Sequence, residues 1–174
     1  MSYPEEEHGF SMPAVYMNRG TKLALSAWVP LLDTPIAAGG LVTVGGSNSC
    51  KEYEKIRLTY GAHEVESGDI HGDGSYTRDP HELLALGRRL HATSFEAGDL
   101  VLSTVYTMQG FATNVSRQWR VSAVSRWIME GDDVGPDPRY MRTGDGLAGW
   151  DANRENKARY PRSMQQAKAD WGLG

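Results

Sequence analysis

The chain has 174 residues and a formal net charge of −4, which suits about one domain with a core of its own. Acidic and basic residues are interspersed, so there is no basic stripe for nucleic acid and no polybasic patch for a membrane. No apolar run reaches the about 18 residues of a membrane helix, and we read no leader peptide. The single cysteine, Cys50, rules out an internal disulfide and suits a reducing compartment, so we expect a cytoplasmic protein.

The first part of the chain predicts two strands separated by turns. An apolar run at 14–17 ends at the turn residues 18–20. Residues 22–32 are expected to form a strand with Pro30 close to its end, where the loss of a backbone donor is tolerated. Residues 39–47 place a short β-branched strand between two glycine turns.

The middle of the chain, about residues 48–92, is polar and irregular, and we interpret it as a long insertion between strands. Asp79 followed by Pro80 is typical of a helix N-terminus, so a short helix is predicted directly after them. Long loops in compact domains often cover a binding site, and this insertion is a candidate for that role.

The later part of the chain predicts more strands and then an irregular tail. A turn at 97–99 leads into a strand at 100–106, and 108–126 reads as two short strands about a polar turn. Residues 119–126 alternate at the period of a strand, which places Arg120 on one face. An arginine on an inward-facing strand is costly to bury alone, so Arg120 is a candidate anion holder.

Short strands with glycine turns, and without alternating amphipathic helices, predict an all-β barrel or sandwich instead of a parallel α/β sheet. The sequence shows no internal repeat, low-complexity segment or linker. We therefore expect one domain over 1–174, with a core at about 14–140, the insertion at about 48–92 and an irregular tail at 131–174.

Several segments, taken in their order and spacing, resemble the phytanoyl-CoA dioxygenase family of iron and 2-oxoglutarate oxygenases. The segments are residues 15–21, 27–33, 39–41, 46–47, 97–101, Asn114 with 120–122, and 137–140. The resemblance covers roughly residues 14–140, and its order carries more weight than any single motif. It implies a double-stranded β-helix, the jelly-roll or cupin-like fold.

The resemblance also implies an iron site made of a His-x-Asp pair and a later histidine, with an arginine that receives 2-oxoglutarate. By position, Arg120 and Ser122 match the oxoacid anchor. The metal positions do not match, because the later histidine falls on Gln109 and the His-x-Asp pair falls near residues 11–13, which are serine, methionine and proline. We therefore expect no metal ligands and no iron, with 2-oxoglutarate or a similar oxoacid as a candidate ligand of Arg120.

Other histidines do not replace the missing ligands in the sequence. A shifted register recruits His8, but Phe10 then stands where a carboxylate is needed. The literal His-x-Asp formed by His71 and Asp73 lies in the insertion, after the strands that it should precede. We interpret it as part of a polar loop.

One class of function is an enzyme that kept the pocket and performs metal-independent, non-oxidative chemistry on a small secondary-metabolite substrate, as an isomerase or cyclase would. Gln109 and Tyr16 are then the catalytic donors that stabilise developing negative charge. A purely structural role is the alternative, with Gln109 as a neutral filler and Arg120 paired with a buried carboxylate. The expected ligand-binding residues are Arg120, Ser122, Asn114 and Trp28.

A second class is a non-catalytic partner or regulatory subunit of an intact iron/2-oxoglutarate oxygenase. A third is a true dioxygenase with unusual ligands. The chain begins where the usual N-terminal part of the family ends, which predicts an exposed apolar sheet. We therefore expect a homodimer or a heteromer with a related oxygenase.

Overall fold

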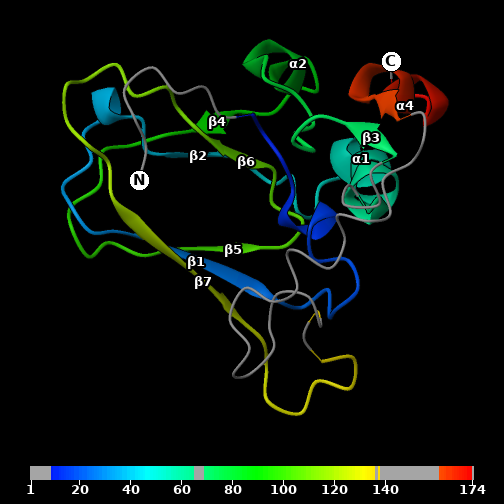
Figure 1. The fold of residues 1–174 in the computed structure, drawn as a ribbon, viewed down its shortest axis with the longest axis horizontal. Coiled ribbons are helices and arrows are strands. Elements are labelled where there is room, and N and C mark those ends of the chain that lie inside the picture. Colours follow the sequence, from blue (N-terminus) through cyan, green and yellow to red (C-terminus); the bar gives the residue numbers. More distant parts are fainter. Residues whose placement is uncertain (1–8, 65–68, 136, 138–160, 174) are drawn as a thin grey trace.

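The structure is a computed structural model that describes residues 9–64, 69–135, 137 and 161–173. These residues form two small antiparallel sheets, one parallel strand pair and a few short helices (Figure 1). In Figure 1 the sheet β4–β2–β6 lies above the sheet β5–β1–β7. The all-β class is therefore confirmed at the level of small antiparallel sheets with few helices.

The lower sheet has β1 as its central strand, between β5 and β7. Its strands are β1 (Leu25–Pro30), β5 (Val101–Thr104) and β7 (Ser122–Trp127). The upper sheet has β2 in the centre, and its strands are β2 (Leu41–Val44), β4 (Leu90–His91) and β6 (Gln109–Phe111). The strands predicted at 22–32, 39–47 and 100–106 are thus confirmed with shorter bounds.

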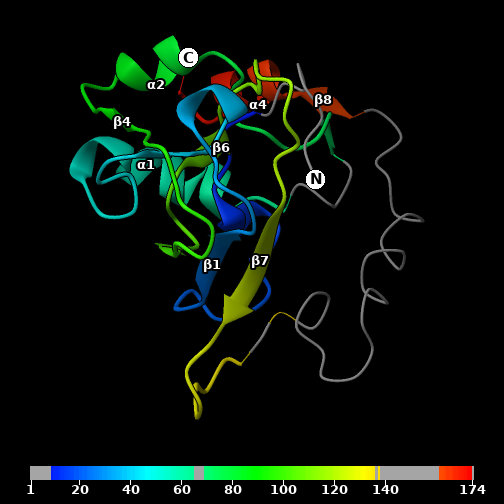
Figure 2. The same cartoon turned by 90° about the vertical axis from the view of Figure 1, so that its left-hand side faces the viewer.

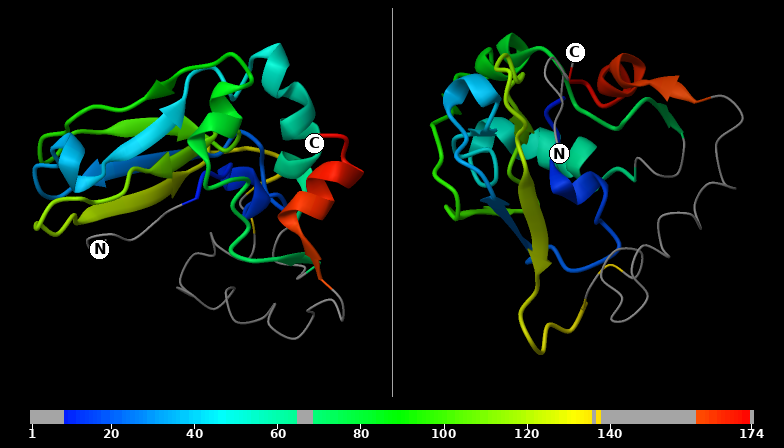
Figure 3. Two further views of the ribbon diagram at one scale, coloured as in Figure 1. Left: turned by 90° about the horizontal axis from the view of Figure 1, so that it is seen from above. Right: turned by 60° about the vertical axis from the view of Figure 1, so that its left-hand side comes forward.

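The helices are short, and the three α-helices gather toward one end of the sheets (Figure 3). The α-helices are α1 (Glu54–Leu58), α2 (Pro80–Leu84) and α4 (Met164–Asp170). The 3-10 helices are η1 (Pro13–Val15), η2 (Ile36–Ala38), η3 (Lys51–Tyr53) and η4 (Tyr60–Ala62). The parallel pair joins β3 (Ile70–His71) to β8 (Arg162–Ser163).

The helix predicted after Asp79 is confirmed as α2. The Asp79 side chain accepts a hydrogen bond of 2.9 Å from the backbone N–H of His81, which satisfies one of the unpaired donors at a helix start. By contrast, α1 was not predicted, since five residues are too few to show a helical period. Tertiary packing holds α1 in place, because Ile56 is buried in the main core.

The segment 108–126 contains two strands as predicted, but β6 and β7 do not pair with each other. β6 pairs with β2 and β7 pairs with β1, so the two strands belong to different sheets. Figure 2 shows the connection between them descending into β7. The polar residues of the connection therefore carry the chain from one sheet to the other.

The main core lies on one face of β2. Val42 and Val44 point to this face, where the buried side chains of η1, η3, α1, η4 and α2 pack against them. The opposite face of β2 carries Leu41 and Thr43, which alternate with the two valines. This second face is turned toward the sheet β5–β1–β7, because Phe111, opposite Leu41, contacts Trp28 of β1.

The outer face of the sheet β5–β1–β7 is apolar and exposed. Leu25 is opposite Trp127 and Ala27 is opposite Leu102, so these side chains share a face. Leu102 is 58% exposed and Trp127 is 62% exposed. A partner that covers this face stays a prediction.

Among the described segments, every helix is too short or too polar to span a bilayer.

Candidate functional site

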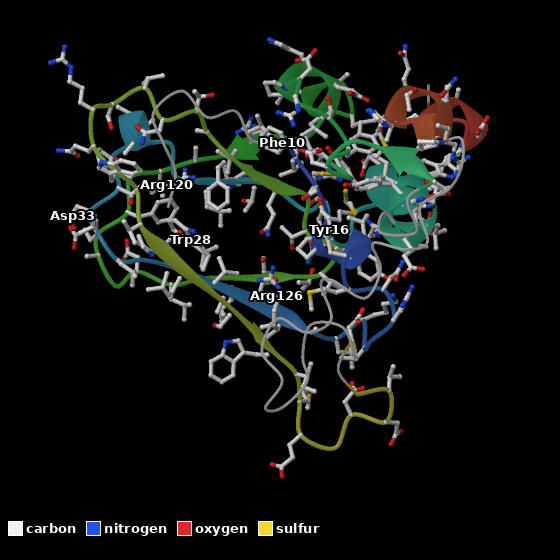
Figure 4. The ribbon with its side chains drawn as sticks, in the orientation of Figure 1. Phe10, Tyr16, Trp28, Asp33, Arg120 and Arg126 are labelled. Carbon is white, nitrogen blue, oxygen red and sulfur yellow. The ribbon has the colours of Figure 1, made fainter. Side chains whose placement is uncertain are left out.

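The candidate site lies between the two sheets, where Trp28 is the central side chain. Trp28 is 3% exposed. Its ring meets Phe95 edge-on at a centroid distance of 4.9 Å and Phe111 at 6.2 Å. Because Phe111 belongs to β6, these contacts define the inner face of both sheets. Figure 4 shows Trp28, Arg120 and Arg126 on this side of β1 and β7.

Arg120 lies two residues before the start of β7 and is 5% exposed. Its guanidinium lies 4.2 Å from the centroid of the Phe111 ring, which is a cation–π geometry. The structure therefore places Arg120 inward, beside the aromatic cluster of Trp28, Phe95 and Phe111. A role in holding an oxoacid stays a prediction.

Gln109 lies directly beside Ser11, although the two residues are far apart in the sequence. The Ser11 N–H donates to the Gln109 carbonyl at 2.8 Å, and the Gln109 N–H donates to the Ser11 carbonyl at 3.0 Å. The two positions that the resemblance aligned with metal ligands are thus neighbours in space. The Gln109 side-chain oxygen accepts a hydrogen bond of 3.0 Å from Ser103. Within the described part of the chain, the side-chain NH2 of Gln109 makes no hydrogen bond.

A cavity of about 430 Å³ opens at this pair and includes Tyr16 in its wall. The Tyr16 hydroxyl donates to the backbone carbonyl of Asp73 at 2.7 Å. Its proton is therefore directed to the insertion. The wall of this cavity includes Ser11, Tyr16, Gln109, Phe111, Asp73 and Arg78.

The insertion contributes a charged pair to the mouth of this cavity. The Asp73 carboxylate accepts hydrogen bonds from the Ser75 N–H at 3.0 Å and from Arg78 at 2.7 Å. Burial opposes ionisation of Asp73, but the hydrogen bonds from Ser75 and the charge of Arg78 outweigh it and lower the pKa of Asp73. The insertion thus contributes residues to the wall of this cavity, whereas its role in covering a binding site stays a prediction.

A second cavity, of about 490 Å³, lies on the other side of Leu41, which lines both cavities. Its wall is mainly apolar, with Leu90, Phe95 and Val101 from three segments. Thr43 and His91 add polar atoms to it.

The walls of these two cavities contain none of the four predicted ligand-binding residues, although Trp28 and Arg120 contact the wall residue Phe111. Asn114 is fully buried, and its side-chain NH2 donates to the Gln118 carbonyl at 2.8 Å. The Asn114 side-chain oxygen accepts from the N–H and the hydroxyl of Ser116. These three hydrogen bonds account for Asn114 as the residue that holds the turn at 114–118. Ser122 opens β7 opposite Pro30.

Sequence reasoning did not select Ser26, Ser103 or Arg126, which all lie on the inner face. Atoms of Ser26, Trp28 and Arg126 are buried without a hydrogen-bond partner among the described residues. Each such atom costs about 1–3 kcal/mol. The alternation of 119–126 already placed Arg126 on the same face as Arg120, whereas the serines required the strand register.

The described residues do not fit the iron ligands that the fold family implies. They contain no group of three or more His, Cys, Asp or Glu side chains that could hold a metal ion. A hydroxyl at Ser11 and an amide at Gln109 do not replace imidazoles and a carboxylate. His71 is exposed, and His8 lies outside the described residues.

No family model matches the sequence, and a comparison with curated proteins also finds no match. Solved structures do match. One is the non-heme alpha-ketoglutarate-dependent carbocyclase SnoK from nogalamycin biosynthesis, with a TM-score of 0.51 and 18% identity over 71% of this chain and 45% of that chain. Another is the non-heme alpha-ketoglutarate-dependent epimerase SnoN of the same biosynthesis, with a TM-score of 0.47 and 17% identity over 78% of this chain and 45% of that chain.

The chain therefore spans less than half the length of these solved proteins, and the likeness concerns the fold. The fold resembles that of non-heme alpha-ketoglutarate-dependent enzymes. Membership of the phytanoyl-CoA dioxygenase family stays a prediction.

The expectation that iron is absent is corrected by SnoK, which has a TM-score of 0.51 and is described as a non-heme alpha-ketoglutarate-dependent enzyme. A further SnoN structure contains Fe3+, alpha-ketoglutarate and nogalamycin RO, with a TM-score of 0.43 and 16% identity over 72% of this chain and 43% of that chain. The missing ligand pattern at residues 11–13 and Gln109 was too local a basis for excluding the metal. Binding of iron and of 2-oxoglutarate to this protein is therefore measured directly in the test below.

Proposed function

We propose that the two sheets are the halves of a double-stranded β-helix and that the chain is an isomerase- or cyclase-type enzyme for a small secondary metabolite. One observation carries the proposal: Gln109 and Phe111 line the same cavity, and the Arg120 guanidinium lies over the Phe111 ring. The description of SnoK as a carbocyclase of nogalamycin biosynthesis supports this reaction class.

The chemistry that fits these residues is the stabilisation of negative charge on a carbonyl oxygen. Transfer of a proton from the carbon beside a carbonyl to the Asp73 carboxylate of the same cavity wall leaves negative charge on the carbonyl oxygen. A fixed amide donor such as Gln109 binds that oxygen more strongly as the charge grows. Arg120 adds a positive field from behind the Phe111 ring. Tyr16 lies in the wall of the same cavity, and its own proton is directed to the Asp73 carbonyl.

A buried guanidinium fits a carboxylate, so Arg120 is the residue that would hold 2-oxoglutarate. The oxoacid would supply electrons for oxygen chemistry when iron is also bound. No step is assigned to iron, because the described residues do not fit its ligands. The role of a non-catalytic partner subunit is not favoured, since the similar solved structures are described as enzymes.

The test uses nogalamycin and its biosynthetic precursors as substrates, in D2O, with and without added Fe(II) and 2-oxoglutarate. An isomerase or cyclase that works through an enolate gives a product without added oxygen, and deuterium enters beside the carbonyl. Gln109→Ala is expected to slow this exchange by about 100-fold, the size of the loss of one charge-stabilising donor. A product that gains an oxygen atom, with one succinate formed per turnover, contradicts the proposal.

The matched control is Gln118→Ala, whose side chain is exposed on the turn before β7. It leaves the cavity untouched and is expected to keep the exchange rate of the wild type. Equal loss in both variants would show that the amide of Gln109 has no special part. Iron bound to the purified protein is measured in parallel by elemental analysis.

A further inference from the structure

A row of polar side chains crosses the inner face of the sheet β5–β1–β7. Arg126 is opposite Ser26, and Ser26 is opposite Ser103 on the next strand. Directly opposite residues in an antiparallel sheet place their side chains on the same face. The hydroxyl of Ser103 then donates to Gln109 at 3.0 Å. The row therefore runs from Arg126 to the amide at the cavity.

The Arg126 end of this row has donors but lacks acceptors. The hydroxyl of Ser26 and the Nη1 of Arg126 are buried and have no hydrogen-bond partner among the described residues. The Nε of Arg126 donates to the sulfur of Met17 at 3.3 Å, and a thioether is a weak acceptor. Burial lowers the pKa of Arg126, and no carboxylate of the described residues offsets this effect.

A structural arginine in a protein interior normally meets a carboxylate or several carbonyl oxygens. Arg126 meets neither among the described residues, and Ser26 beside it is 3% exposed. The indole N–H of Trp28, two residues along β1 on the same face, also has no partner there. The side chains of Ser26, Trp28 and Arg126 thus place three donors without hydrogen-bond acceptors on one face, among the described residues.

We propose that Arg126 and Ser26 form a carboxylate-binding site, separate from Arg120, that holds the acidic substituent of a planar aromatic substrate. The guanidinium offers two parallel donors, the arrangement that a carboxylate matches best. The aromatic part of the ligand is expected to contact Trp28 and Phe111, which flank the row. This inference rests on the proposed function, because it names the class of substrate for the same site.

A carboxylate at Arg126 has two sources, the substrate or 2-oxoglutarate. Arg120 and Arg126 lie on the same side of the sheet, so both sources are tested with separate probes. Anthraquinone-2-carboxylate is a planar aromatic acid, and anthraquinone-2-carboxamide is its uncharged match. 2-Oxoglutarate is the third probe. Binding of each is measured by calorimetry and by quenching of tryptophan fluorescence.

The wild-type protein is expected to bind the aromatic acid at least tenfold more tightly than the amide. Arg126→Gln removes this preference, and Ser26→Ala reduces it by a few-fold. Arg126→Lys keeps part of this preference, because the positive charge remains but the two parallel donors of the guanidinium are lost. Arg117→Gln changes an exposed arginine and is expected to keep the full preference. Circular dichroism checks that each variant is folded.

Equal binding of acid and amide by the wild type overturns the proposal, as does an unchanged preference in Arg126→Gln. If Arg126→Gln does not fold, the Ser26→Ala and Arg126→Lys results decide. Loss of 2-oxoglutarate but not of the aromatic acid in Arg126→Gln assigns the site to the oxoacid and also overturns it. Binding is measured without turnover. If the protein binds the aromatic acid with the expected preference but shows no deuterium exchange, the proposed function is rejected and the carboxylate site at Arg126 is supported.

Discussion

The two faces of the sheet β5–β1–β7 differ in a way that reverses the usual pattern. A half-buried antiparallel sheet normally turns apolar side chains inward and polar ones to water. Here the inner face carries Ser26, Ser103 and Arg126, whereas the outer face exposes Leu102 and Trp127. The inner face is thus poorly suited to a dry core and well suited to a polar ligand, while the outer face is suited to packing.

The inner face also carries apolar side chains, because Val101 and Val124 lie opposite Trp28. Truncation of Trp28 is expected to have the largest effect. Trp28→Ala removes a buried ring that contacts Phe95 and Phe111, which should lower the free energy of unfolding by about 3–5 kcal/mol. Denaturation in urea measures the change. The matched control is Trp127→Ala on the outer face, where the exposed ring should cost less than about 1 kcal/mol. Equal losses would mean that the two faces do not differ.

The outer face should matter for association instead. If a second copy covers Leu102 and Trp127, Trp127→Ala should weaken self-association by about 2 kcal/mol, the size of an interface hot spot. Sedimentation velocity at tens of micromolar measures this. A well-behaved monomer in the wild type removes the expectation of a homodimer, and a heteromer would then be sought by co-purification with a related oxygenase.

Replacing Arg126 is expected to stabilise the protein, whereas most mutations of buried residues destabilise it. Arg126→Met should raise the free energy of unfolding of the ligand-free protein by about 1–2 kcal/mol, because a buried unsatisfied donor is replaced by apolar atoms. The exposed arginine in Arg117→Met serves as the control, with a change near zero. A loss of stability in Arg126→Met would indicate that Arg126 has a structural acceptor.

The smallest effect is expected at the rim of the cavity, where Asp73 is partly exposed. Its lowered pKa means that the ionised form stabilises the fold above the ordinary value near 3.8. This stabilisation is lost as the pH falls through the lower pKa of the folded state. Melting temperatures between pH 6 and pH 2 should therefore fall slightly less steeply for Asp73→Asn than for the wild type. Identical slopes would contradict the assigned hydrogen bonds.

The iron expectation shows why an incomplete motif can mislead. The sequence argument compared single positions, Ser11 and Gln109, with a ligand pattern. The structure confirms that these positions are neighbours, since their backbones are bridged by two hydrogen bonds. Yet the dependence of similarly folded enzymes on alpha-ketoglutarate argues against excluding iron from ligand identities alone.

Local patterns in the sequence were sufficient for much of the fold. Apolar and β-branched runs bounded by turns predicted β1, β2 and β5, and the side-chain chemistry of Asp79 with Pro80 predicted the start of α2. Alternation also placed Arg120 on an inward face. These features depend on neighbours within a few residues, which the sequence states directly.

Only the tertiary structure decided which strands meet. It separated β6 from β7 into two sheets, joined Gln109 to Ser11, and aligned Ser26 with Arg126. Strand pairing depends on contacts between distant segments, and short strands leave many registers open, so no local signal specifies them. The alternation around Arg120 therefore indicated an inward cation, while the row from Arg126 to Gln109 exists only through the register of three strands.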